Sequence, residues 1–359
     1  MWFPTLSSLA AAGALVALAD ARPQNSGSSS TACNNSPTLC DRKFNEITFL
    51  GGHNSAFLRD QSTGNSLSGN QYLNATKALD AGLRLLQAQV HKANETLVLC
   101  HSSCSLLDAG PLEDWLGAIN GWMGANPNDV VTVLLVNAAS ATADEYHTVF
   151  QSSGLGDISY KPNVTGASSD WPTLKSMIDS KQRLVSFVTE IAQSDTAPTI
   201  LDEFSYVFET PFDVTELGGF NCTLDRPTNQ DTAANALANG FLSLVNHFKY
   251  NRLTDTIQLP DVDSIDTVND PGTAVGNIGR HLDTCNSEWK SRPNFVLVDF
   301  FDQGDPLAAV DKMNGLSDVT GRADVKSLGD DSSAASGLKS RGLEFGAFLA
   351  FFSAAILLV

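Results

Sequence analysis

The chain has 359 residues, of which 42% are hydrophobic and 17% charged, and its formal net charge is -18 at pH 7. So large an acidic excess disfavours nonspecific binding to nucleic acid or another polyphosphate, so neither is expected as a partner. The sequence also lacks a Gly-x-Ser-x-Gly elbow, a Gly-x4-Gly-Lys-Ser/Thr loop and a His-Glu-x2-His helix. These absences argue against a serine esterase, a nucleotide hydrolase and a zincin.

The first 21 residues have the pattern of a cleaved secretory signal peptide. An apolar run from Leu6 to Leu18 precedes two overlapping Ala-x-Ala patterns, which predict cleavage after Ala19 or Ala21. The run is too short to span a bilayer comfortably. Residues 22–39 begin with a Ser/Gly-rich stretch and are expected to form a flexible leader. We therefore expect a secreted protein.

The folded part is expected to be one domain, residues 40–316, in which short apolar runs alternate with helical patterns. Eight runs predict strands at residues 47–50, 83–90, 96–99, 130–136, 183–188, 206–208, 242–248 and 294–300. The clearest helix is "PLEDWLGAINGWMGANP", which has Pro111 in its first turn and ends at Asn126-Pro127.

The run after this helix, "VVTVLLV", is apolar on both faces. A strand of this kind belongs to a parallel sheet that is covered by helices. Eight strands in one α/β chain therefore predict a (β/α)8 TIM barrel, which the uneven connections make distorted. In such a barrel, polar residues at the carboxyl ends of the strands converge on one mouth.

The last 43 residues are expected to comprise a polar linker, residues 317–332, and a GPI-attachment propeptide, residues 333–359. Small residues around Ser332 and Ser333 precede a polar spacer and an apolar tail from Phe345 to Val359. A helix of that tail covers about 22 Å of a roughly 30 Å hydrocarbon core, so we favour a GPI signal over a membrane span. The expected location is the extracellular face of the plasma membrane or the cell wall.

The six cysteines all follow the signal peptide, and their even number suits an oxidising compartment. Six cysteines allow fifteen pairings, of which local loops favour Cys33 with Cys40, Cys100 with Cys104, and Cys222 with Cys285. Metal thiolates are a weaker interpretation, since no Cys-x2-Cys pair is present. Sequons predict glycosylation at Asn74, Asn94, Asn163 and Asn221.

Polar residues lie at the carboxyl ends of the predicted strands or within them, and they are the candidate site residues. They are His53, Asn54, Gln87, Gln89, His101, Asn137, Glu209, His247 and Asp299. His53 and His101 can act as general base and general acid near neutral pH, because the ordinary imidazole pKa is about 6.5. Asp299 can orient one of them, as in a catalytic triad.

The other residues of this set are expected to bind substrate, with two alternatives open. His247 and Glu209 are as consistent with packing or turn capping as with a place in the pocket. We interpret His91, His147 and His281 as structural.

The stretches "EITFLGGHNSAF", "ALDAGLRLLQAQVHK", "LVLCHSSCSLLDAGPLEDWLGAINGWMGANPNDVVTVLLVN" and "RPNFVLVDFFDQGDPLAAVDKMN" resemble the phosphatidylinositol-specific phospholipase C X-domain superfamily, especially its secreted fungal members. The resemblance implies that His53 is the general base toward an inositol hydroxyl and that His101 protonates the leaving alcohol. It also implies that Asp299 supports the base.

The resemblance departs at the positions that neutralise the phosphate. Members of the superfamily place charged residues there, either Asp and Arg or the acidic ligands of calcium, where this chain has Gln87 and Gln89. Asn54 matches the calcium-binding asparagine and would be a ligand only if calcium binds. Because Ca²⁺ normally takes several carboxylates, we expect no metal cofactor.

Two functions remain open. The first is a cell-surface phosphodiesterase that uses the histidine pair on a phosphodiester lipid or its headgroup. The second is a noncatalytic barrel that binds a glycan or lipid headgroup in the cell wall. A glycosidase built from Glu190 and Glu209 is a more distant third. In each case a monomer is expected.

Overall fold

The computed structural model of the protein describes Met1 and residues 31–254 and 257–325. Apart from Met1, the predicted signal peptide lies outside these ranges, as do the GPI-attachment propeptide and parts of the leader and the polar linker. In the described ranges, no helix combines the length and apolar character needed to cross a membrane.

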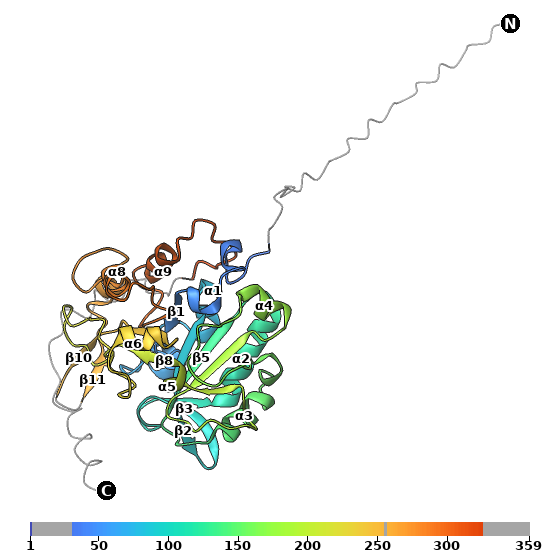
Figure 1. Ribbon diagram of the computed structural model, residues 1–359, viewed down its shortest axis with the longest axis horizontal. Helices are drawn as coiled ribbons and strands as arrows, with labels where there is room; N and C mark the ends of the chain where they lie inside the picture. The colour runs from blue at the N-terminus through green and yellow to red at the C-terminus, as the bar shows by residue number, and fades with distance from the viewer. Residues whose placement is uncertain (2–30, 255–256, 326–359) are drawn as a thin grey trace. The chain divides into compact units, whose positions relative to one another are not determined.

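Eight parallel strands form a curled sheet in the order β7-β6-β5-β2-β1-β12-β9-β8 (Figure 1). Every neighbouring pair in this series is parallel. Along the chain each barrel strand is followed by its neighbour in the sheet, except that β7 is followed by β8 at the opposite end of the series. No ladder joins β7 to β8 within the described residues, and α5 (Glu203–Tyr206) connects them across the open seam. The fold is therefore a distorted (β/α)8 barrel. The strands are β1 (Phe49–Gly52), β2 (Leu85–Ala93), β5 (Val131–Asn137), β6 (Leu184–Val188), β7 (Ile200–Asp202), β8 (Val207–Glu209), β9 (Leu242–Asn246) and β12 (Phe295–Val298).

One of the eight predicted strands forms but is not a barrel strand. The run at 96–99 is β3 (Thr96–Cys100), which pairs antiparallel with the outer half of β2 and is followed by β4 (Asp108–Pro111). It forms a hairpin outside the barrel series. The eighth barrel strand is β7, which the sequence analysis did not predict, because its three residues are too few to give a periodic pattern.

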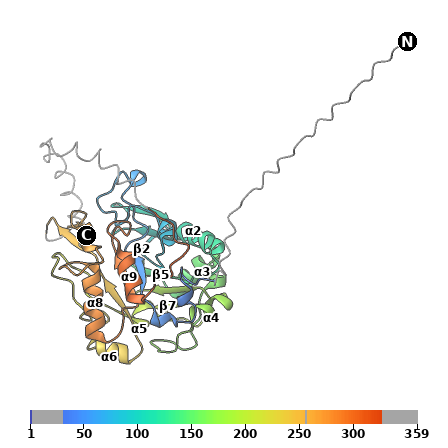
Figure 2. The ribbon, with the colours of Figure 1, turned by 90° about the horizontal axis from the view of Figure 1, so that it is seen from above.

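The helices lie outside the sheet. Figures 1 and 2 place α2, α3 and α4 on one side of the barrel and α6, α8 and α9 on the opposite side. The predicted helix 111–127 is α2, with Pro111 at its N-cap and Asn126 at its C-cap. A second small sheet, β10 (Tyr250–Arg252) with β11 (Gln258–Pro260), follows β9. The α-helices other than α5 are α1 (Ala75–Ala81), α2 (Leu112–Ala125), α3 (Ala143–Ser152), α4 (Leu174–Asp179), α6 (Ala233–Ala238), α7 (Ile265–Val268), α8 (Ile278–Trp289) and α9 (Pro306–Asn314).

Alternation along the strands divides the core into two clusters. One cluster fills the barrel, with Phe49, Leu85 and Leu297 among its members. The other lies between the sheet and the helices and includes Leu50 and Val296, the neighbours of Phe49 and Leu297 in sequence. A residue an even number of positions from Phe49 or Leu297 along the same strand therefore points into the barrel. This alternation sets the direction of the polar residues at the strand ends.

Replacing Gly51 with alanine is expected to destabilise the fold by about 1–3 kcal/mol. A Cβ at Gly51 would lie 2.6 Å from Cγ of Leu85, which is fully buried in the barrel. Gly117 in α2 is the matched control, since an added Cβ meets nothing within 4 Å there and alanine is the better helix former. Urea unfolding should show a loss for Gly51→Ala alone; equal stability of the two variants would contradict this packing.

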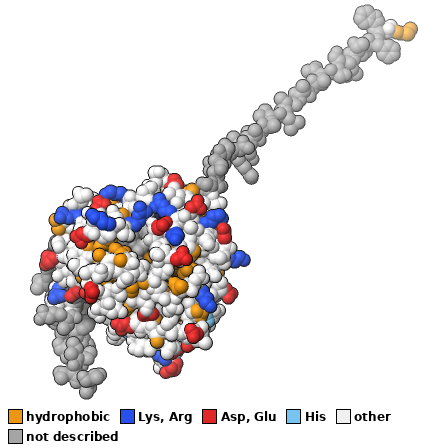
Figure 3. Space-filling view, in the orientation of Figure 1, with side chains coloured by type: hydrophobic (Ala, Val, Ile, Leu, Met, Phe, Trp, Pro, Cys, Tyr) orange, Lys and Arg blue, Asp and Glu red, His pale blue; other side chains and the backbone are white. Residues whose placement is uncertain are grey.

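The three disulfides are those predicted, and no cysteine is free: Cys33–Cys40, Cys100–Cys104 and Cys222–Cys285. The four sequon asparagines are exposed, so their glycosylation stays a prediction that the fold permits. On the face shown in Figure 3, acidic and basic side chains are interspersed rather than separated.

Candidate functional site

His53 follows the last residue of β1 and lies at the mouth of the barrel. Its backbone N–H donates to the Val298 carbonyl at 2.8 Å, so the β1–β12 ladder continues to the histidine itself. Its ring is parallel to that of Phe248, with ring centroids 3.7 Å apart and planes 1° apart. The ladder fixes the backbone and the stacking fixes the ring plane, so His53 is held in one orientation.

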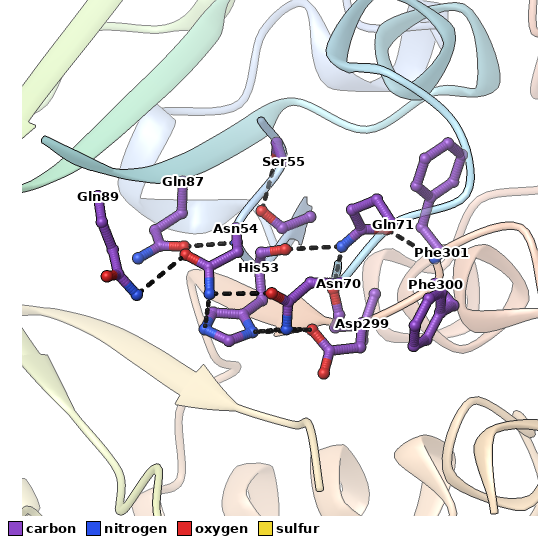
Figure 4. A network of polar contacts seen from close by, with 12 residues as sticks. His53, Asn54, Ser55, Asn70, Gln71, Gln87, Gln89, Asp299, Phe300 and Phe301 are labelled. Carbon is purple, nitrogen blue, oxygen red and sulfur yellow. Dashed lines mark hydrogen bonds and ion pairs between the residues drawn. The ribbon is translucent and has the colours of Figure 1, made fainter. Parts of the chain in front are cut away.

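Asp299 orients the imidazole through its Nδ1 atom (Figure 4). The distance from His53 Nδ1 to Asp299 Oδ1 is 2.8 Å, and both side chains are buried. Because a carboxylate only accepts, Nδ1 carries the proton of the neutral ring and Nε2 keeps its lone pair. The Asn54 amide donates to that lone pair at 3.1 Å. The nitrogen that faces Asn54 is therefore the basic one.

Two residues of the loop before α1 complete this arrangement, and the sequence analysis missed both. The Asn70 amide donates to Asp299 Oδ1 at 2.9 Å and accepts from Asn54 Nδ2 at 3.2 Å. The Gln71 amide donates to the carbonyls of His53 (2.7 Å) and Val298 (3.0 Å), which ties the ends of β1 and β12 together. Both side chains are fully buried. No periodicity or known motif marks them in the sequence.

Gln87 and Gln89 point inward from β2 and hold Asn54. Gln87 Oε1 accepts the backbone N–H of Asn54 at 2.6 Å, and Gln89 Nε2 donates to Asn54 Oδ1 at 3.4 Å. Gln89 also accepts the backbone N–H of Ser102, next to His101, at 3.0 Å. Gln89 thus links the His53 turn to the loop that carries His101.

His101 follows β3, where the Cys100–Cys104 disulfide closes a short loop. Its ring contacts Phe57 edge-on at 5.2 Å, and its Nδ1 has no partner among the described residues. Burial first, and then charge on His53 and His91, lowers the pKa of His101 to about 4. The two candidate catalytic imidazoles are therefore close enough to repel each other when both are protonated.

The residues around Asn54 do not fit a calcium site. Gln87 Oε1 and Asn54 Oδ1 already accept hydrogen bonds, and the Asn54 amide N–H faces the histidine rather than a cation site. Both β2 residues are neutral, whereas calcium is normally held by several carboxylate oxygens. The nearby carboxylate, Asp299, accepts from His53 and Asn70 through Oδ1, and its Oδ2 is buried without a hydrogen-bond partner among the described residues.

Glu209 lies at the seam of the barrel. Its carboxylate forms an ion pair with Arg226 and accepts from Asn246 Nδ2 at 3.3 Å. Glu203 of α5 is fully buried beside it; burial raises the pKa of Glu203, the negative charge of Glu209 raises it further and Arg226 opposes the shift. Glu209 lies two residues after Val207 in β8 and points inward as Val207 does, but no hydrogen bond of the described chain connects it to His53.

Asn137 and His247 are not brought to the His53 network. The Asn137 side chain closes its own loop by bonding the backbone of Ala141, and it accepts from the Tyr146 hydroxyl at 2.9 Å. His247 lies two residues after Val245, points outward as Val245 does, and contacts His281 of α8. Burial lowers the pKa of His247 to about 3 and that of His281 to about 4.

The PI-PLC X 1 family model matches residues 39–314, which is the whole barrel. The chain belongs to the PI-PLC X domain family. A PI-PLC X domain-containing protein 1 of Arthroderma benhamiae is 39% identical over 286 residues, which is 79% of this chain and 90% of the relative. An uncharacterized secreted protein of the same organism is 36% identical over 77% of this chain and 62% of its own length.

The barrel is also similar to a solved structure. Phosphatidylinositol-specific phospholipase C from Listeria monocytogenes matches with a TM-score of 0.50 at 14% identity, over 77% of this chain and 96% of the other. At this identity the likeness shows the fold alone.

Proposed function

We propose that the protein is a metal-independent phosphodiesterase that cleaves a phosphodiester by general acid and base catalysis. The observation that carries this proposal is the buried His53–Asp299 pair at the barrel mouth, with Nε2 of His53 left as the base. The names of the family and of its structural neighbour suggest the substrate class, a phosphoinositide or its headgroup. A substrate of this class has a hydroxyl next to the phosphate.

In this mechanism the hydroxyl replaces the Asn54 amide at His53 Nε2 and gives up its proton there. Its oxygen then attacks phosphorus, and the bond from phosphorus to the leaving alcohol breaks. His101, in its protonated form, donates a proton to the leaving oxygen. The products are a cyclic phosphodiester and an alcohol, and each histidine ends with the protonation state that the other began with.

Neutral donors must compensate the charge that develops on the phosphoryl oxygens. No lysine or arginine hydrogen-bonds to the His53 network in the described part of the chain, whereas the Asn54 amide contacts the ring and the Gln89 amide contacts Asn54. An amide aimed at a developing oxyanion contributes up to about 3–4 kcal/mol, or 10²–10³ in rate. We therefore propose slow but real turnover.

The test uses purified protein, residues 22–331, with phosphatidylinositol and with glycerophosphoinositol, and follows the cyclic product by phosphorus NMR. Turnover should be lost in His53→Ala and His101→Ala and kept in His147→Ala, whose ring lies on helix α3. Turnover that survives both active-site substitutions would overturn the mechanism.

A noncatalytic headgroup- or glycan-binding module is the second candidate. It is favoured by Gln87 and Gln89, whose amides fix Asn54 over the basic nitrogen and bring no charge. In that case the same assay gives no product from any phosphodiester, and calorimetry gives headgroup or glycan binding that His53→Ala does not weaken.

Excess chelator should leave turnover unchanged within about twofold. The reason is the donor set around Asn54, which consists of amides that are already hydrogen-bonded. Activity is measured after dialysis against EDTA, and again after calcium is added back. A loss that calcium restores would show that Asn54 is a metal ligand and would refute the metal-independent mechanism.

We also propose that the protein is secreted and held at the cell surface by a GPI anchor, with phosphodiester substrate in the membrane or wall. Support comes from the terminal sequence signals and from the secreted relative of 36% identity. Replacing both Ser332 and Ser333 with leucine should release the protein from the surface fraction or retain it inside the cell.

A further inference from the structure

A cavity of about 260 Å³ lies at the end of the barrel opposite the catalytic mouth. The irregular segment 160–173, helix α4 and the turn after that helix form its walls. Ser159, just before this segment, pairs with Leu184, the first residue of β6, so the cavity lies at the amino ends of the strands. The proposed catalysis takes place at the other end and uses none of these residues.

The segment that borders the cavity covers a cluster of aromatic rings. The Trp171 ring stacks on Phe44 and Tyr160, with centroids 4.9 Å and 5.5 Å apart, and meets Tyr206 edge-on at 6.4 Å. All four rings are buried and belong to the core cluster that fills the barrel. The Tyr206 hydroxyl donates to the Val164 carbonyl at 3.4 Å. A ligand in the cavity would hold the segment over these rings.

The polar groups of the cavity wall fit a neutral ligand that both donates and accepts hydrogen bonds. Four of these groups make no hydrogen bond within the described chain: Tyr160 Oη, the Asn163 amide, Ser176 Oγ and Gln182 Nε2. Lys161 and Asp170 also line the cavity, and their charges are opposite. Hydroxyl and amide groups both donate and accept. An N-acetylated sugar has this chemistry.

Asn163 lines the cavity and is also the acceptor of the sequon Asn163-Val164-Thr165. It lines a second cavity too, but that one has only about 50 Å³, little more than the roughly 30 Å³ that one molecule of liquid water takes up. The larger volume lies just below the roughly 300–1,000 Å³ of sites for drug-sized ligands, so it suits a single sugar ring. The other predicted sequon asparagines, Asn74, Asn94 and Asn221, line neither cavity.

We propose that this cavity binds the first N-acetylglucosamine of an N-glycan on Asn163. The inference rests on the proposed secretion, which brings the chain to the glycosylation machinery. In the attachment step the amide nitrogen of Asn163 bonds the anomeric carbon of the sugar and loses one proton, and the lipid diphosphate that carried the glycan leaves. The sugar then joins the segment 160–173 to α4 and covers the base of the barrel.

The covalent link makes a weak sugar site sufficient. A ligand tethered by a short linker meets its site at an effective concentration of the order of millimolar. Because Asn163 is itself part of the wall, the tether here is a single side chain. The sugar therefore needs only the few hydrogen bonds that the free wall groups offer.

The test uses the full-length chain secreted from a yeast that adds high-mannose glycans. An endoglycosidase cuts each glycan between its first two sugars, and mass spectrometry follows every site. The glycan on Asn94, in the exposed turn between β2 and β3, is the internal control. In the folded protein, cleavage at Asn163 should be at least about tenfold slower than at Asn94, because the bound sugar must first leave the cavity. In peptides of the unfolded protein the two rates should be equal.

A pair of variants on α4 separates the cavity from the loop around it. Ser176→Tyr fills the cavity and should raise the rate at Asn163 to that at Asn94. Lys175→Tyr is the matched control, since Lys175 is an exposed neighbour on the same helix that does not line the cavity. It should leave the protection at Asn163 unchanged. Protection that persists in Ser176→Tyr would contradict binding in this cavity.

A second measurement needs no variant. With isotope-labelled N-acetylglucosamine, NMR should show contacts between the N-acetyl methyl group on Asn163 and the ring protons of Tyr160 or Trp171. Equal cleavage rates in the folded protein, or the lack of such contacts, would overturn the proposal. An empty Asn163 beside an occupied Asn94 would also overturn it, and binding of free chitobiose would then assign the cavity to an external glycan. If neither asparagine carries a glycan, the proposed secretion fails together with this inference.

Discussion

Replacing Asp299 with asparagine should lower kcat for phosphodiester cleavage by about 10³–10⁴ without unfolding the protein. A triad carboxylate replaced by its amide gives a loss of this order because the imidazole adopts the wrong tautomer. Asparagine has nearly the same shape as aspartate, so the contact with His53 and the packing around it can persist. The variant therefore tests the effect of the lost charge and the changed tautomer while the structure stays the same.

The expected change can be followed atom by atom. Asp299 Oδ1 now accepts from both His53 Nδ1 and the Asn70 amide. If the asparagine that replaces Asp299 turns its amide nitrogen to His53, and the Asn70 amide turns so that two N–H donors do not face each other, the ring must accept at Nδ1 and its proton moves to Nε2. The Nε2 lone pair that should take the substrate proton is then lost. Stacking on Phe248 still holds the ring plane.

The control is Asp283→Asn, which removes an exposed carboxylate from α8 that pairs with Lys312. It should keep full activity, since exposed ion pairs contribute little. Nitrogen NMR of His53 adds a direct readout: the wild-type ring should show Nδ1–H, and Asp299→Asn should show Nε2–H. A variant that shows the changed tautomer and keeps wild-type turnover would exclude His53 as the base.

The barrel and the contact between His53 and Asp299 could be predicted because both depend on local pattern. A strand apolar on both faces specifies a covered parallel sheet, and the carboxyl ends of such strands share one edge. His53 and Asp299 follow β1 and β12, which are neighbours in the sheet. Their contact therefore requires only that β1 and β12 pair when the barrel forms.

Asn70 and Gln71 could not be predicted, because their roles come from tertiary contacts. They lie in an irregular loop. Their amides donate to Asp299 and Val298, which are more than two hundred residues away in sequence, and to the backbone of His53, which is nearer. Polar loop residues have no period that marks one as buried. The three-residue strand β7 escaped prediction for a related reason, since it is recognised only by its pairing with β6.

His247 shows where closer use of alternation would have helped. In β9 the inward residues are Leu242, Leu244 and Asn246, so the next residue must point outward to the helices. The same alternation puts Gln87 and Gln89 with Leu85, inside the barrel. A polar residue at a strand end is thus a candidate site residue, but the alternation of side chains along the strand decides whether that residue faces the barrel mouth.

The second large effect concerns His101 and the leaving group. His101→Ala should lower kcat/KM for an alkyl leaving group by about 10²–10⁴, the usual contribution of a general acid. A nitrophenyl phosphodiester should be affected far less, because a good leaving group departs without protonation. His53 acts on both substrates, so the comparison isolates the acid.

The pH dependence of this ratio follows from the lowered pKa. Burial first, and then charge on His53 and His91, lowers the pKa of His101 to about 4. A group with a lowered pKa is protonated only below that value, so raising the pH removes the acid. The ratio of kcat/KM for the alkyl substrate to that for the nitrophenyl substrate should therefore fall about tenfold per pH unit above pH 5.

Taking the ratio matters because the protonation of His53 enters both rate constants and cancels. What remains is the free-enzyme titration of His101, since kcat/KM reports the unbound state. The ratio should lose its pH dependence in His101→Ala and keep it in His91→Ala. A ratio that stays flat from pH 5 to 8 in the wild type would mean that His101 does not protonate the leaving oxygen. The proton would then have to come from solvent, and the His53–Asp299 pair would be the whole of the catalytic machinery.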